Sequence, residues 1–74
     1  MNIKRAIRKE MKRAKSLNDW PTDIIHQAAV IAEEAGEVVQ SANNFVYGAA
    51  SKEKIKEEVI QTIVTCLRYL EANK

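Results

Sequence analysis

The sequence predicts a small all-α protein that is built from three helices and stabilised by self-association. Only two glycines and one proline occur among its 74 residues, and 46% of the residues are hydrophobic, which suits helices rather than disorder. Apolar residues recur at helical spacing in three segments that are separated by polar breaks. A chain of this length buries only about 60% of its unfolded surface, and its single cysteine cannot form an intrachain disulfide. Association with further copies of the chain is therefore the expected source of additional stability.

The first helix is predicted over residues 2–16. One stripe of this segment is apolar and is formed by Ile3, Ile7, Met11 and Ala14. Residues 1–16 carry seven bases against the single acid Glu10, a net charge of +6, while the rest of the chain carries −4. We expect the stripe to dock on the acidic remainder of the protein, where the bases would attract nucleotide. No aromatic residue lies between the bases, which disfavours nucleic acid as a partner.

The second helix is predicted over residues 21–47 and the third over residues 51–72, with a break at residues 16–19 after the first. Asp19 is the expected N-cap of the second helix, Pro21 suits its first turn, and Gly48 is expected to close it in a left-handed conformation. Ser51 is the expected N-cap of the third helix, with Glu53 in its first turn.

The third helix is apolar on more than one side, because Ile60 and Val64 lie off the stripe that runs from Ile55 to Leu70. An antiparallel hairpin of the second and third helices buries only one face of each. We therefore expect a homodimer, or a dimer of dimers, that closes a four-helix bundle. The whole chain, 1–74, is treated as one domain, in which the basic helix 1–16 precedes the hairpin 20–72.

No apolar run approaches the roughly 18 residues that span a membrane. No signal peptide is visible either, and an unpaired Cys66 fits a reducing compartment, so the expected location is the cytoplasm without membrane attachment.

Three acidic residues, Glu33, Glu34 and Glu37, stand alone in the second helix. They are the only charged residues from Ile24 to Ser51, a range in which His26 is the one basic side chain. Residues three and four apart are neighbours on a helix, and each like-charge pair costs roughly 0.2–0.5 kcal/mol. Because no base lies one turn away on this helix, a divalent cation is the simplest source of the missing positive charge.

The third helix supplies a second set of oxygen ligands. Glu58 and Gln61 are three residues apart, and in an antiparallel hairpin they lie about as far from the turn as Glu34 and Glu37. Three carboxylates and one amide oxygen would then face a hard cation such as Mg²⁺, which takes oxygen ligands and keeps waters for phosphates to displace.

Glu33-Glu34-Ala35-Gly36-Glu37, followed by Glu58-Val59-Ile60-Gln61, resembles the EExxE…ExxD signature of the MazG-like, all-α nucleoside triphosphate pyrophosphohydrolases. The resemblance runs from Trp20 to Glu71. It implies Mg²⁺-dependent hydrolysis of a nucleoside triphosphate to the monophosphate and pyrophosphate, with Mn²⁺ as a substitute metal. It further implies catalytic roles for four carboxylates, which are Glu33, Glu34, Glu37 and Glu58. The metal ligands that it implies are Glu34, Glu37, Glu58 and Gln61. Glu33 is then a further ligand or the group that orients the attacking water.

Gln61 departs from this pattern, because the family usually has Asp at the position. An amide oxygen binds magnesium without contributing a negative charge, so the ligand set is less negative by one.

The remaining candidates are residues that would hold the nucleotide. Trp20 has a flat face for stacking on a base, and His26 and Gln27 follow it along the second helix. The expected phosphate contacts are the bases nearest the acidic residues, which are Lys52, Lys54, Lys56 and Arg68. Each also has a purely structural interpretation: Trp20 as a cap over the first helix, His26 as a structural residue, and the lysines as a solvated helix start.

Three function classes follow from these patterns. The first is a metal-dependent nucleotide pyrophosphohydrolase, and the second is a catalytically weak relative that binds nucleotide or metal. The third is a small helical interaction or RNA-binding protein whose acidic residues are incidental. A di-iron carboxylate bundle is disfavoured because that fold needs two Glu-x-x-His motifs, and the sequence has one histidine.

Overall fold

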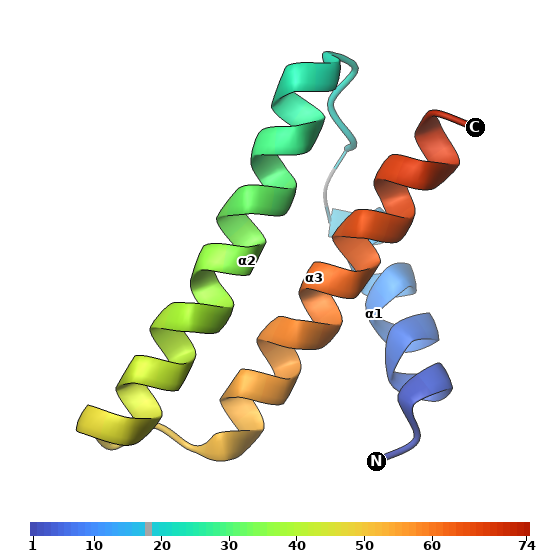
Figure 1. Cartoon of the computed structure of the whole chain (residues 1–74). Helices are drawn as coiled ribbons and strands as arrows, with labels where there is room; N and C mark the ends of the chain where they lie inside the picture. Colours follow the sequence, from blue (N-terminus) through green and yellow to red (C-terminus); the bar gives the residue numbers. More distant parts are fainter. Residues whose placement is uncertain (18) are drawn as a thin grey trace.

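The protein folds into three α-helices, as described by a computed structural model that covers residues 1–17 and 19–74. These are α1 (Ile3–Leu17), α2 (Ile24–Tyr47) and α3 (Lys52–Ala72), and no strand occurs in the described residues. Figure 1 shows α2 and α3 as an antiparallel hairpin, with α3 between α2 and α1 in this view. α3 packs against both other helices, whereas α1 and α2 do not pack directly on each other in the described structure. The predicted all-α class, the three helices and the hairpin are confirmed.

The start of α2 differs from the prediction. Asp23, rather than Asp19, is the N-cap, and its Oδ1 accepts a hydrogen bond of 2.8 Å from the Ile25 N–H. The helix begins at Ile24, so Pro21 lies before it and not in its first turn. An Asp that stands directly before an apolar helical segment satisfies an N–H that has no partner inside the helix. Of the predicted break at residues 16–19, position 18 lies outside the described residues, and α1 continues through Leu17.

The end of α2 is also different, because Gly48 does not adopt the predicted left-handed conformation. Its φ and ψ angles are −135° and −151°, which is extended backbone. Glycine is nevertheless favoured here by space, since a Cβ added at Gly48 would lie 2.9 Å from the carbonyl oxygen of Asn44. The requirement at this turn is therefore close approach of two backbone segments rather than a positive φ.

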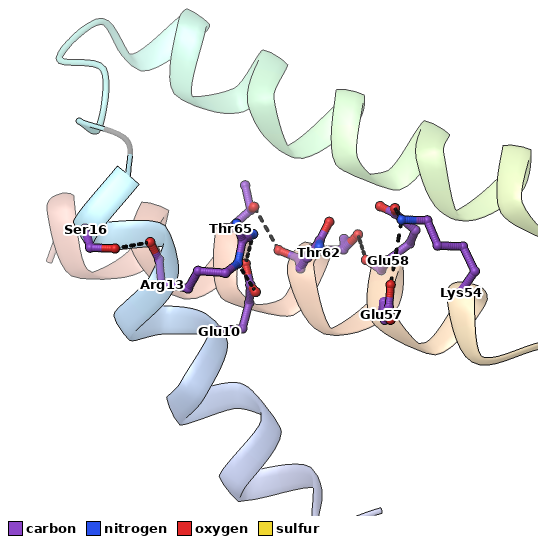
Figure 2. A network of polar contacts seen from close by, with 9 residues as sticks. Glu10, Arg13, Ser16, Lys54, Glu57, Glu58, Thr62 and Thr65 are labelled. Carbon is purple, nitrogen blue, oxygen red and sulfur yellow. Dashed lines mark hydrogen bonds and ion pairs between the residues drawn. The ribbon is translucent and has the colours of Figure 1, made fainter.

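Side-chain hydrogen bonds support the start and the interior of α3. Ser51 is the N-cap, as predicted, and its Oγ accepts a hydrogen bond of 3.3 Å from the Lys54 N–H. Glu53 lies in the first turn, as expected. Inside the helix, the hydroxyls of Thr62 and Thr65 donate to the carbonyls one turn earlier, at 2.8 Å and 2.9 Å (Figure 2). These bonds satisfy the polar groups of a β-branched segment that remains helical.

The core is small and contains several polar side chains. Its buried hydrophobic residues are Ala14, Ile60 and Val64, which come from α1 and α3. The buried polar residues are Gln27, Ser41, Glu58 and Thr65. Large apolar side chains remain exposed on both helices of the hairpin, among them Ile24, Ile25, Val39, Val46, Leu67 and Leu70. The predicted surplus of apolar surface is present. None of the described helices is long and apolar enough to cross a bilayer.

Candidate metal site

Three carboxylates from two helices meet at one point of the hairpin. Glu34 and Glu37 are three residues apart and share a face of α2, while Glu58 comes from α3. One carboxylate oxygen from each lies within 4.8 Å of the others. Glu58 is the most buried of the three, with 6% of its surface exposed, and Glu34 and Glu37 are half-buried. Hereafter these three residues are called the acidic cluster.

Two oxygens of the acidic cluster lack a hydrogen-bond partner. Oε2 of Glu34 and Oε2 of Glu58 are buried and accept no hydrogen bond from any described residue. A buried polar atom without a partner costs roughly 1–3 kcal/mol, and more when it is charged. Carboxylate oxygens are the ligands that hard divalent cations prefer. Both the donor atoms and their unmet bonding capacity therefore fit a hard cation.

A lysine from α3 partly offsets the negative charge of the acidic cluster. The Nζ of Lys54 lies 3.1 Å from Oε1 of Glu58 and 3.7 Å from Oε2 of Glu57, as Figure 2 shows. The expectation that no base lies near the acidic residues therefore holds along α2 only, because the counter-charge comes from the neighbouring helix. One ammonium group faces three carboxylates, which leaves the ionised cluster negative.

Crowding of the carboxylates changes their proton affinity. Burial raises the pKa of Glu34 most, and the charges of Glu37 and Glu58 raise this pKa further. Hydrogen bonding with Glu58 is the largest cause that raises the pKa of Glu37, followed by burial. The cluster thus retains a proton more readily than ordinary carboxyl groups do, and a cation that binds there must displace it.

A cleft of about 450 Å³ adjoins the acidic cluster, where α1 and α2 approach α3 without packing directly on each other. Six residues predicted from the sequence as site residues line it: Trp20, His26, Glu33, Glu34, Gln61 and Arg68. Glu33 is exposed and lies outside the acidic cluster of three, and Gln61 lies on the cleft wall one turn after Glu58. The structure therefore joins the acidic cluster to a cavity through Glu34.

Trp20 is less accessible as a stacking surface than the sequence suggests. The guanidinium carbon of Arg68 lies 5.0 Å from the centre of its ring, a cation–π contact that covers one face. The indole Nε1 is buried and donates to no acceptor in the described part of the chain. Trp20 therefore lines the cleft with part of its ring, while its N–H donor is buried.

Four predicted substrate contacts do not line this cleft: Lys54, which pairs with Glu58, and Gln27, Lys52 and Lys56. Gln27 is 4% exposed, its Nε2 donates to the Pro21 carbonyl at 2.8 Å, and its Oε1 accepts from Asn73 Nδ2 at 2.6 Å. Its amide therefore links the segment before α2 to the C-terminal end of α3 by two hydrogen bonds. Lys52 and Lys56 are exposed on the first turns of α3, and Lys56 pairs with Glu53 at 3.6 Å.

α1 contributes two cleft residues that sequence reasoning did not select. The guanidinium of Arg13 donates two hydrogen bonds of 2.7 Å to the carboxylate of Glu10, and both residues line the cleft (Figure 2). Their spacing of three residues predicts the ion pair itself. The packing of α1 against α3 decides that this pair lies beside Glu34.

Comparisons of the chain with models of protein families, with curated proteins and with solved structures returned no match. The chemistry of the site therefore rests on the geometry of its residues.

Proposed function

We propose that this protein is a Mg²⁺-dependent nucleoside triphosphate pyrophosphohydrolase. The observation that carries the proposal is the acidic cluster, with carboxylate oxygens of Glu34, Glu37 and Glu58 within 4.8 Å of one another and buried oxygens without partners. The adjoining cleft of about 450 Å³ is large enough for a small-molecule ligand. The resemblance of the two motifs to the MazG-like family supplies the reaction class.

In this proposal Glu34, Glu37 and Glu58 hold the cation, and the amide oxygen of Gln61 adds a neutral ligand from the cleft wall. A bound Mg²⁺ neutralises phosphate charge and lowers the pKa of a water molecule. Glu33, exposed at the cleft, would orient a water molecule there. These residues hold the reacting groups at the edge of the cleft, and positioning together with charge stabilisation is the main contribution of a protein to phosphoryl transfer.

The cleft residues bind the rest of the substrate. Trp20 offers the open part of its ring to the base, with His26 also on the cleft lining. Arg68, which lines the cleft, is one proposed phosphate contact. Lys54 is the second: it does not line the cleft but pairs with Glu58, and a bound cation would compete with it for that carboxylate. The substrate class that fits is a nucleotide with a polyphosphate chain.

The exposed apolar surface supports a homodimer, or a dimer of dimers, that buries the outer faces of α2 and α3. Sedimentation should give a mass of at least twice 8.4 kDa at micromolar concentration. A folded monomer under these conditions would contradict the dimer but would leave the metal site untouched.

Pyrophosphate release from a panel of ribo- and deoxynucleoside triphosphates with Mg²⁺ tests the activity. We expect turnover that falls at least about a hundredfold in Glu37→Gln and Glu58→Gln, in the range typical for removal of one catalytic group. Glu53→Gln, an exposed acid of α3 outside the acidic cluster, is the matched control and should retain activity. Turnover that survives both cluster substitutions would refute the assignment.

A second candidate is a binding protein without turnover, which the neutral Gln61 and the Lys54–Glu58 ion pair favour. In that case no nucleotide releases pyrophosphate, yet the melting temperature rises with Mg²⁺, because a ligand that binds only the folded state stabilises it. An equal Mg²⁺ response in wild type and Glu34→Gln would exclude metal binding at the acidic cluster and therefore both candidates.

A further inference from the structure

α1 carries a positive charge that its own fold does not neutralise. Of its seven bases, Arg13 pairs with Glu10 at 2.7 Å and Lys15 pairs with Glu71 at 3.4 Å. The other five are exposed, and no ion pair joins them to a carboxylate of the described residues; they are Lys4, Arg5, Arg8, Lys9 and Lys12. Four of the five line one open hollow on the surface of α1. These five bases are called the basic face.

The position of the bases along α1 opposes helix formation. The first turn contains no acid and begins with Lys4 and Arg5, although positive charge is unfavourable at the N-terminal end of the helix dipole. Lys4–Arg8, Arg8–Lys12 and Arg5–Lys9 are like-charge neighbours four residues apart. A helix face that is merely solvated would mix acids with these bases. α3 shows that ordinary arrangement, since its Lys54 and Lys56 each pair with a glutamate one turn away.

The opposite side of α1 is already used. Ala14 is buried, Ile7 and Met11 are half-buried, and α1 packs against α3 (Figure 1), so most of the apolar stripe is committed to the fold, while Ile3 at its start is 59% exposed. An amphipathic helix binds a membrane surface by burying its apolar face among lipids, and here most of that face is occupied. The partner that fits is therefore a polyanion that approaches from solvent.

We propose that the basic face of α1 binds the phosphate backbone of nucleic acid independently of sequence. The 15 residues of α1 extend about 22 Å, long enough to contact several phosphates. Without an aromatic residue for base stacking, binding depends on charge, which supplies most of non-specific affinity. The absence of aromatic residues thus sets the mode of binding rather than excluding it. This proposal is independent of the proposed enzyme activity.

Fluorescence anisotropy tests the proposal with a labelled mixed-sequence DNA duplex and a labelled single-stranded RNA as probes. We expect binding to one or both probes in about 50 mM salt, with affinity falling steeply by about 200 mM. For the duplex, five phosphate contacts give a log–log salt slope of up to about −4.5. The two probes distinguish the strand form that supplies the phosphates.

A pair of triple variants assigns the site. Arg5→Gln/Lys9→Gln/Lys12→Gln should raise Kd at least about tenfold and reduce the magnitude of the salt slope by about 1 per residue. Lys52→Gln/Lys56→Gln/Lys74→Gln removes the same charge from exposed sites outside α1 and should bind almost as wild type does. Circular dichroism checks that both variants remain helical.

Three results would overturn the proposal. One is the absence of binding to either probe in about 50 mM salt, a concentration at which non-specific complexes form. Another is an equal loss of affinity for the probes in the two triple variants, which would show that binding depends on the net charge of the protein and not on the basic face. The third is binding to phosphatidylserine vesicles but not to nucleic acid, which would identify α1 as a membrane-surface helix.

Discussion

The ammonium group of Lys54 lies 3.1 Å from Oε1 of Glu58, the most buried carboxylate of the acidic cluster. Lys54 itself is half-exposed, so it can turn towards solvent without disturbing the packing of α3. The charge of Glu58, to which Lys54 is hydrogen-bonded, raises the pKa of Lys54. A cation at the cluster would compete with this lysine for the same carboxylate.

Lys54→Gln should therefore lower the stability of the metal-free protein but strengthen the binding of Mg²⁺. In EDTA the melting temperature should fall, because Glu58 loses its partner. In Mg²⁺ the variant should reach half of its thermal stabilisation at a lower metal concentration than wild type. Lys56→Gln, whose partner Glu53 is exposed, is the control and should change neither value appreciably. If Lys54→Gln and Lys56→Gln changed the melting temperature and the Mg²⁺ requirement by the same amount, Lys54 would not compete with the cation at the acidic cluster.

The raised pKa values of Glu34 and Glu37 predict how stability without metal depends on pH. The folded state binds these protons more tightly than the unfolded state, so their contribution is complete below the ordinary value near 4.5. It is lost as the pH rises through the raised pKa values of the folded state. Urea unfolding in EDTA should show wild type losing stability relative to Glu34→Gln as the pH rises above the ordinary value near 4.5. A constant difference would contradict the shift for Glu34.

Metal binding should depend on pH in the opposite direction, because the cation requires deprotonated carboxylates. The Mg²⁺ concentration that gives half-maximal thermal stabilisation should decrease as the pH rises across the same range. Glu34→Gln should weaken this dependence, since one of the competing protons is removed.

Gln61→Asp restores the acid that the MazG-like signature has at this position. We expect a lower Mg²⁺ concentration for half-maximal stabilisation, and each tenfold decrease corresponds to about 1.4 kcal/mol of binding free energy. Gln40→Asp, an exposed site of α2, adds the same charge elsewhere and is the control. If Gln61 does not face the cation, the substitution only adds an uncompensated acid to a half-buried site and lowers stability, with or without metal.

The two glycines of the chain should respond in opposite directions to alanine. Gly36 lies exposed inside α2 with no atom within 4 Å of an added Cβ, so Gly36→Ala should stabilise the fold by about 1 kcal/mol. Gly48→Ala should lower the melting temperature, because its Cβ would meet the Asn44 carbonyl oxygen at 2.9 Å. Thermal melts of both variants check the pair. A destabilising Gly36→Ala would indicate a partner packed against this part of α2.

The sequence by itself determined the helices and the meeting of the three carboxylates of the acidic cluster. Periodicity, the Ser51 cap and the shortage of breakers are local signals, and they predicted the three helices to within a few residues. Competition between nearby capping residues is harder to resolve, so the cap expected at Asp19 is found at Asp23, and Gly48 is extended rather than left-handed. Helical spacing and equal distance from the turn were sufficient to bring Glu34, Glu37 and Glu58 together.

Only the tertiary structure decided how the chain's polar groups are used. The ion pair of Lys54 with Glu58 joins residues four apart on one helix and is a local contact, whereas the packing of α1 on α3 decided that the Glu10–Arg13 pair lines the cleft with Glu34. The same holds for Gln27, whose amide bonds to Asn73, a residue 46 positions away. Such contacts depend on the relative placement of whole helices, and that placement is set by the shape of the core rather than by local pattern. The sequence therefore determined which groups are present, and packing decided which of them meet.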